Sequence, residues 1–142
     1  MGKRDKLIHN LRSQELSGRK RALPVVSLEN FFEGNDDYGS IGCNLSADEH
    51  PGPQGFYEIL RAIRQREDVQ DVLVEIHEWE EDEEAWPFSE RIYILTTATP
   101  NDVAQWVACL HPDDVSEGYA FGKPPFAPIS EPGQRVFSVW WD

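Results

Sequence analysis

The densest group of chemically active side chains in this chain lies between residues 78 and 86. Nine consecutive positions hold six carboxylates and two indoles: Glu78, Trp79, Glu80, Glu81, Asp82, Glu83, Glu84, Ala85 and Trp86. Carboxylates bind arginine and lysine side chains through ion pairs, and tryptophan is a frequent anchor at protein interfaces. The segment therefore predicts a surface that binds a basic partner, with Trp79 and Trp86 as flanking anchors.

Two other interpretations of this segment remain open. A solvated hairpin loop would use the same charge to maintain solubility and to protect nearby strand edges. Alternatively, the loop binds the protein's own N-terminal arm, because the first 21 residues carry seven cations and two anions, a net charge of +5. The other 121 residues carry six cations and 24 anions, a net charge of −18, within a formal total of −13. A body this negative repels nucleic acid and anionic lipid and attracts basic proteins.

A second group of side chains predicts a pocket rather than a surface. Glu75 and His77 lie two positions apart in an apolar, strand-like stretch, so they share one face of that strand. Arg91 begins the next strand-like stretch and would lie beside them if the two strands pair. The long segment 113–133 would then act as a lid over an apolar ligand, closed by Tyr119, Phe121 and Phe126. This alternative makes the protein a small-molecule-binding domain or an enzyme.

No catalytic or metal-binding motif supports an enzyme directly. The chain has no G-x-S-x-G nucleophile elbow and no Gly-rich phosphate loop ending in lysine. Glu75 and His77 are too few for a structural zinc site, and residues 35–39 are too short for a twelve-residue calcium loop. Cys43 and Cys109 form no C-x-x-C pair, and we expect both to be reduced and buried. We expect no cofactor and no metal, and a non-enzymatic protein rather than an enzyme.

The chain also lacks targeting signals. No apolar run approaches the roughly 18 residues that span a bilayer. The basic N-terminal segment contains no continuous apolar stretch of the kind found in signal peptides. These patterns predict a cytoplasmic protein with neither a membrane nor a nucleic-acid partner.

Apolar periodicity predicts the elements that position these groups. Strands are expected at residues 23–32, 40–45, 69–79, 91–97 and 135–141. Spacings of three and four predict a short helix within 3–17, a helix over 54–66, and another that starts after Thr99 and stops before Pro112. Thr99 as N-cap, Pro100 at the first position and Asp102 at the third make that last start the clearest local signal. Segment 113–133 shows no periodicity and contains four prolines, so it is expected to be a loop.

This order of elements predicts an α+β fold with a mainly antiparallel five-stranded sheet and two helices packed on one face. Residues 1–21 form a basic N-terminal arm, either mobile or docked on the acidic body or on a neighbouring subunit. Residues 22–142 form a single acidic α+β domain, a length sufficient for one core.

The leading functional hypothesis is a non-enzymatic interaction protein whose acidic face binds a basic protein partner. Its sharpest form is an inhibitor with the general character of the small acidic bacterial immunity proteins, which neutralise a toxin. A third hypothesis is an oligomeric scaffold, in which the basic arm of one subunit docks on the acidic face of another.

Overall fold

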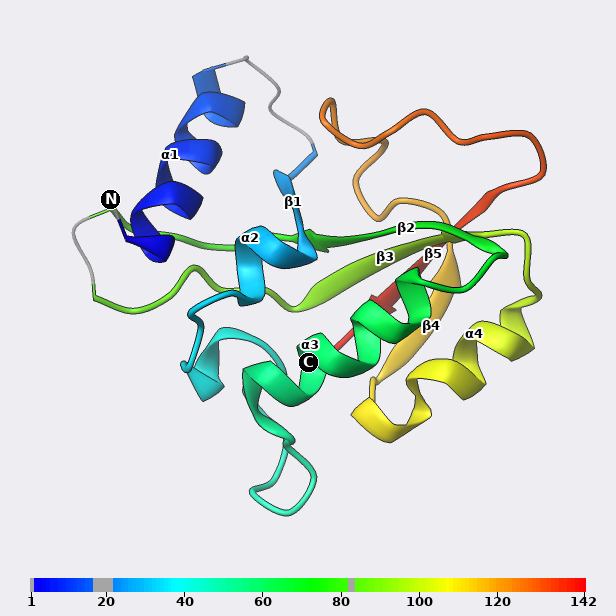
Figure 1. Ribbon diagram of the computed structural model, residues 1–142, viewed down its shortest axis with the longest axis horizontal. Coiled ribbons are helices and arrows are strands. Elements are labelled where there is room, and N and C mark those ends of the chain that lie inside the picture. Colours follow the sequence, from blue (N-terminus) through cyan, green and yellow to red (C-terminus); the bar gives the residue numbers. More distant parts are fainter. Residues whose placement is uncertain (1, 17–21, 82–83) are drawn as a thin grey trace.

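The computed structural model describes residues 2–16, 22–81 and 84–142, and one antiparallel sheet of five strands lies at its centre (Figure 1). The strand order is β1-β2-β3-β5-β4. The strands are β1 Val25–Ser27, β2 Val69–Glu75, β3 Arg91–Thr96, β4 Asp114–Glu117 and β5 Arg135–Trp140. The helices are α1 Lys3–Leu16, α2 Leu28–Phe32, α3 Gly52–Arg64 and α4 Pro100–Val107, with 3-10 turns η1 Tyr38–Ser40 and η2 Ala108–Leu110. The predicted α+β class and antiparallel five-stranded sheet are confirmed.

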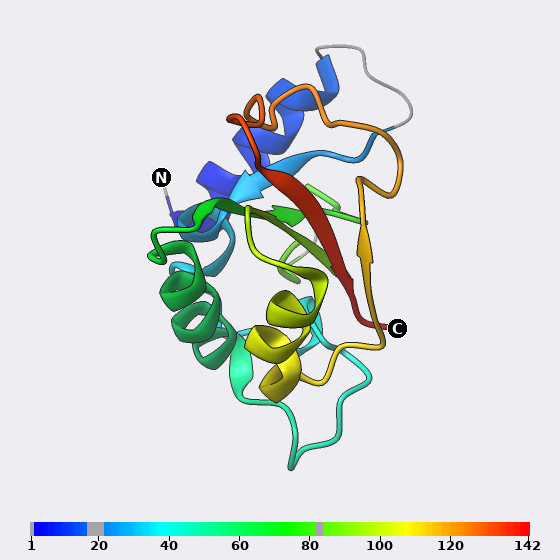
Figure 2. The same cartoon turned by 90° about the vertical axis from the view of Figure 1, so that its right-hand side faces the viewer.

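Alternating side chains divide the sheet into two faces of different character. Val72 lies opposite Ile94 and Val74 opposite Ile92 across the β2–β3 pair, and all four point into the main core. Helices α3 and α4 cover this face (Figure 2), as the sequence predicts, and contribute buried Phe56, Leu60, Ile63, Val103 and Val107. The other face carries a smaller cluster of Val25, Leu73, Tyr93, Leu95 and Ala127. The chain between β4 and β5 passes over that second face, which leaves the two faces covered by different kinds of structure.

The predicted strand over 23–32 is wrong beyond Ser27. The Ser27 side chain accepts a hydrogen bond from the Asn30 N–H, which caps α2 and turns the chain into a helix at Leu28. A helix also explains the apolar spacing, since positions three and four apart share one helical face. The residues buried by α2 are Leu28, Phe31 and Phe32.

The predicted strand over 40–45 is also wrong, because these residues form turns. Asn35 is buried and donates from its side chain to Phe31 O and to Ser40 Oγ. Asp37 Oδ1 accepts from the Gly39 N–H and caps η1. Such local bonds from side chain to backbone compete with a strand ladder, and here they fold 35–40 back on itself.

The segment 113–133 contains one strand that the sequence analysis missed. Strand β4 pairs antiparallel with β5, with Asp114 opposite Trp140 and Glu117 opposite Phe137. The first of the four prolines is Pro124, so none of them obstructs this pairing. The strand lies at the sheet edge, and its side chains are mostly exposed and polar. Backbone hydrogen bonds hold it to β5, so its sequence shows no apolar alternation.

Helix α1 docks the described part of the N-terminal arm on the body. Leu7 and Leu11 belong to the main core. The Gln14 side chain donates to Val25 O at 2.7 Å and accepts from the Val25 N–H at 3.2 Å, so it pairs with the outer edge of β1. Residues 17–21, the basic end of the predicted arm, lie outside the described residues.

Two smaller observations complete the fold. Cys43 and Cys109 are both exposed, so the expectation that they are buried is wrong; each lies on a turn whose apolar neighbours fill the core instead. The predicted α4 start is confirmed, since Thr99 and Asp102 form a reciprocal capping box. Among residues 2–16, 22–81 and 84–142, no helix has the length and apolar character needed to cross a membrane.

Candidate functional site

The acidic loop, defined here as residues 78–86, connects β2 to β3 at one end of the sheet (Figure 1). Backbone bonds close its base, because the Phe88 N–H donates to Glu78 O at 2.8 Å and the His77 N–H donates to Phe88 O at 2.8 Å. Four carboxylate residues of the loop are exposed: Glu78, Glu80, Glu81 and Glu84. Asp82 and Glu83 lie outside the described residues. The described carboxylates are therefore presented to solvent from a fixed base.

The two tryptophans of the acidic loop are half-buried and pack against the main core. A shallow groove of about 440 Å³ runs beside them, lined by Asp37, Gly39, Glu78, Trp79, Glu80, Ala85, Trp86 and Phe88. The Trp86 backbone N–H donates to Asp37 Oδ2 at 3.1 Å, which fastens the loop to the η1 turn. The indole N–H of Trp86 is buried and donates to no acceptor among the described residues. The groove thus combines aromatic walls with acidic rims.

Helix α1 contacts the acidic loop through two arginines. Arg4 donates from Nε to Ala85 O at 2.9 Å and from Nη2 to Glu80 O at 2.8 Å. Arg12 lies eight residues further along α1, and its Nη2 is 2.6 Å from Glu81 Oε2. The described part of the basic arm is therefore in contact with the acidic loop of the same chain. This agrees with the interpretation that the loop binds the protein's own N-terminal arm.

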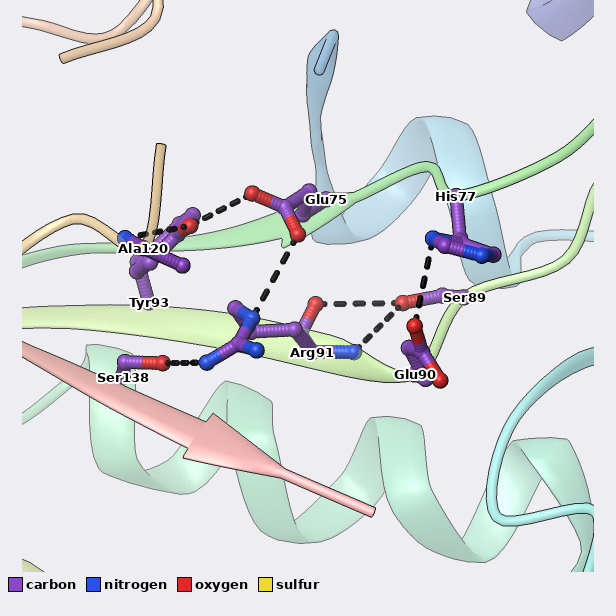
Figure 3. A network of polar contacts seen from close by, with 8 residues as sticks. All are labelled: Glu75, His77, Ser89, Glu90, Arg91, Tyr93, Ala120 and Ser138. Carbon is purple, nitrogen blue, oxygen red and sulfur yellow. Dashed lines mark hydrogen bonds and ion pairs between the residues drawn. The ribbon is translucent and has the colours of Figure 1, made fainter. Parts of the chain in front are cut away.

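A buried polar network occupies the second face of the sheet (Figure 3). Glu75 is 2% exposed and accepts a hydrogen bond from the Tyr93 hydroxyl. Its other oxygen lies 3.5 Å from Arg91 Nε, an ion pair too long for a strong hydrogen bond. The Tyr93 oxygen in turn accepts from the Ala120 N–H at 3.2 Å. The network thereby links β2, β3 and the chain after β4.

The network continues along the sheet, to Ser138 on β5 and to the neighbourhood of His77 just after β2. Arg91 donates from Nη1 to Ser138 Oγ on β5. His77 lies just beyond β2, with Nδ1 3.1 Å from Glu90 Oε1, and Figure 3 shows its ring turned toward that carboxylate rather than toward Glu75. His77 therefore borders the network without joining its buried part.

Burial controls the proton affinities of the network. Burial raises the pKa of the Glu75 carboxyl, although the Tyr93 hydrogen bond and the Arg91 charge both lower it. Burial, followed by the hydrogen bond to Glu75, raises the pKa of Tyr93 far above its ordinary value. Both groups are enclosed and partnered, so the arrangement holds the chain after β4 against the sheet and offers no open acid or base.

The residues predicted for a lidded pocket are only partly brought together. Glu75 and Arg91 are adjacent, and the Tyr119 ring packs edge-on against Tyr93 at 4.9 Å between centroids. Phe121 is 45% exposed and Phe126 52% exposed. The Phe121 ring nevertheless lies against Arg91, with its centroid 5.9 Å from the guanidinium carbon. Tyr119 and Ala127 are the residues of this segment that pack into the smaller cluster on the sheet.

A cavity of about 220 Å³ lies elsewhere, between the second half of α1 and the end of β2. Its walls come from four separate stretches of chain: Leu11, Gln14 and Glu15; Ala22, Leu23 and Pro24; Ile76, His77 and Trp79; and Pro125. Most of these side chains are apolar. Glu15, Gln14 and His77 supply the polar groups.

Comparison with known proteins adds a family. The chain matches the family described as "Uncharacterized protein YfbO family" over residues 2–139. This chain belongs to the YfbO family. It is similar to "Uncharacterized protein YfbO" of Escherichia coli (strain K12), with 39% identity over 120 residues, 84% of this chain and 83% of the relative. No solved structure matches. The YfbO family match spans α1 as well as the sheet, so the helix that contacts the acidic loop lies within the family region.

Sequence reasoning located the acidic loop and the pair Glu75 and Arg91, and it offered contact of the loop with the basic arm as one interpretation, but it assigned no role to three individual residues. Arg4 and Asp37 hold the loop, and Gln14 joins α1 to β1. Each acts through a backbone partner distant in sequence, for which a single sequence holds no signal. Within the described parts of this YfbO-family chain, no cluster of three or more His, Cys, Asp or Glu side chains is placed to hold a metal ion.

Proposed function

We propose that the protein is a non-enzymatic interaction protein whose acidic loop binds a basic segment of a partner protein. One observation carries this proposal: the loop already holds arginine side chains, those of Arg4 and Arg12 from its own chain. Backbone carbonyls and carboxylates of the loop therefore present geometry that guanidinium groups fit. The finer form of the proposal is an immunity-type inhibitor in the bacterial cytoplasm that covers a cationic site on its target.

The carboxylates that remain open favour an external partner. Arg4 binds the backbone oxygens of Glu80 and Ala85, so its contacts with the loop do not use the Glu80 carboxylate. Glu78 and Glu84 are exposed and have no ion pair among the described residues. The groove beside Trp79 and Trp86 offers aromatic surface to a side chain that accompanies the cation. The overall charge of −13 attracts basic partners to the protein.

A charge-reversal experiment tests the proposal at the loop itself. The test variant combines Glu78→Lys, Glu80→Lys and Glu84→Lys, and it spares Glu81 because that residue pairs with Arg12. The matched control, at three exposed positions outside the loop, combines Glu58→Lys, Glu67→Lys and Glu131→Lys. Both variants change the net charge equally, so a difference between them measures location rather than charge.

Two readouts use these variants. Titration with a nonaarginine peptide, followed by calorimetry, is expected to show binding to the wild type and the control variant and loss in the loop variant. Capture from a lysate of the source organism then identifies a basic protein retained by the same two proteins. Equal binding of the peptide and of captured proteins by the loop variant and the control would contradict the proposal, because nonspecific charge attraction would explain both.

A further inference from the structure

The two edges of the central sheet differ in how the rest of the chain covers them. At the β1 edge, the Gln14 side chain of α1 donates to Val25 O at 2.7 Å and accepts from the Val25 N–H at 3.2 Å, in the place of a further strand. Strand β4 forms the opposite edge. Figure 2 shows β4 at the margin of the fold, with no other described helix or strand beyond it. The β4 edge is therefore open.

The register of β4 shows which backbone groups this edge offers. The Gly118 N–H donates to Val136 O on β5 at 2.8 Å, so Gly118 directs its N–H inward. Bonding directions alternate along an antiparallel strand, which turns Ser116 inward as well and Val115 and Glu117 outward. Among the described residues, no group bonds to the outward N–H and C=O of these two residues. A further strand would find two donors and two acceptors here.

Charge decides which strand fits the open edge. Asp113 and Asp114 are exposed and have no ion pair among the described residues, whereas Glu117 pairs with Arg135 at 2.9 Å. A second copy of β4 would bring like charges side by side, which disfavours pairing between identical edges. The same carboxylates attract lysine and arginine. The edge therefore fits an extended segment with basic side chains better than it fits a second copy of itself.

We propose that β4 accepts an extended basic segment of another protein as a sixth strand of the sheet. The segment bonds to the outward backbone groups of Val115 and Glu117, and its cations lie beside Asp114 and Glu117. Val115 is half-buried against the main core, so the residue opposite it is apolar. Strand β5 lies between this edge and the two strands that the acidic loop connects. The proposal consequently does not rest on what that loop binds.

Three capped peptides test the proposal on the full chain. The probe is acetyl-Thr-Lys-Val-Val-Lys-Thr-amide, whose sequence is the same in both directions and so suits a parallel or an antiparallel strand. The second peptide has both valines N-methylated, which keeps the charge and removes backbone donors. The third has glutamate in place of both lysines. Two-dimensional ¹H–¹⁵N NMR is expected to show saturable shifts and slower hydrogen exchange of the Val115 and Glu117 amides with the probe alone.

Two substitutions at one position separate backbone pairing from charge. Glu117→Gln removes the carboxylate and is expected to weaken binding of the probe about twofold, as for an exposed ion pair. Glu117→Pro removes the carboxylate and also the outward N–H, which β5 does not use. It is expected to weaken binding about fivefold more than Glu117→Gln, the size of one hydrogen bond. The spectrum of each variant checks its fold.

The two triple charge-reversal variants described for the acidic loop separate the two surfaces. The loop variant and its control are expected to bind the probe equally. Weaker binding by the loop variant would move the site to the loop and overturn the assignment to β4, whatever nonaarginine does.

Three other results would also overturn the proposal. The first is the absence of a saturable shift at Val115 and Glu117. The second is equal binding of the probe and its N-methylated form, which would leave charge attraction alone; this comparison uses the wild type, so it decides the matter even if Glu117→Pro fails to fold. The third is a mass that rises with concentration in the wild type and not in Glu117→Pro, which would make a second copy the added strand.

Discussion

The acidic loop and the Glu75 network use the same side-chain chemistry in opposite surroundings. In the loop, carboxylates stand in solvent, and the interior contacts are made by backbone oxygens that hold Arg4. In the network, one carboxylate is enclosed, with the Tyr93 hydroxyl bonded to one of its oxygens and Arg91 Nε 3.5 Å from the other. An exposed carboxylate keeps its hydration and stays available to a partner, whereas a buried one must be satisfied from within the fold. Position therefore suits the loop to the recognition proposed above, and it makes Glu75 part of the packing between the strands and the chain after β4.

The largest expected effect comes from a substitution in the buried Glu75 network. Glu75→Ala leaves Arg91 and the Tyr93 hydroxyl without their shared partner, and removal of one member of a buried pair is strongly destabilising. We expect the free energy of unfolding to fall by about 3 kcal/mol. Urea denaturation followed by tryptophan fluorescence measures it. Glu80→Ala in the loop should change stability by less than about 0.5 kcal/mol, and similar losses in the two variants would contradict the division between cohesion and recognition.

A second prediction tests how α1 holds the exposed acidic loop. Arg4→Ala removes two hydrogen bonds to the loop backbone, and we expect the free energy of unfolding to fall by about 1 kcal/mol. Hydrogen exchange of the loop amides should also accelerate. Arg12→Ala is the internal comparison, because its ion pair with Glu81 is about half exposed on both sides and such pairs contribute little.

Exchange at the loop decides between the two arginines. The loop amides are expected to exchange faster in Arg4→Ala and at almost the wild-type rate in Arg12→Ala. If both variants accelerate exchange equally, the attraction between arm and loop is a matter of charge alone, and the backbone contacts of Arg4 have no special part in it.

The same contrast explains how much the sequence could predict. Strands β2, β3 and β5 and helices α3 and α4 are amphipathic, and their apolar periodicity follows directly from burial of one face. The exposure of the acidic loop could also be predicted, because burial of six carboxylates within nine residues would cost too much free energy. The pairing of Glu75 with Arg91 follows once β2 and β3 are placed side by side.

The errors share one physical cause. Residues 28–45 are shaped by side chains that bond to nearby backbone, such as Ser27 and Asn35, and periodicity does not register those bonds. Strand β4 is stabilised through its backbone at an exposed edge, and Arg4 reaches carbonyl oxygens 76 and 81 residues away. Residues of almost every type supply the same backbone N–H and C=O groups, so the pattern of residue types does not predict these contacts.

The smallest predicted effect is a pH dependence with opposite signs at two carboxylates. Burial raises the pKa of Glu75 above the ordinary 4.5, so the folded chain holds the proton more tightly than the unfolded chain. Stability from this group therefore increases as pH falls through the raised pKa toward 4.5. The hydrogen bond from Arg64 lowers the pKa of Glu29, so its contribution is present above 4.5 and is lost as pH falls through the lowered value.

Two isosteric variants measure these signs. As pH falls toward 4.5, the wild type should gain stability relative to Glu75→Gln; below 4.5, it should lose stability relative to Glu29→Gln. Urea denaturation at a series of pH values gives both differences. Glutamine keeps the size and one acceptor of each carboxyl, so the pH-dependent part isolates the proton. A Glu75 curve that follows the Glu29 curve would mean that the charge of Arg91, and not burial, sets the direction of the pKa shift of the Glu75 carboxyl.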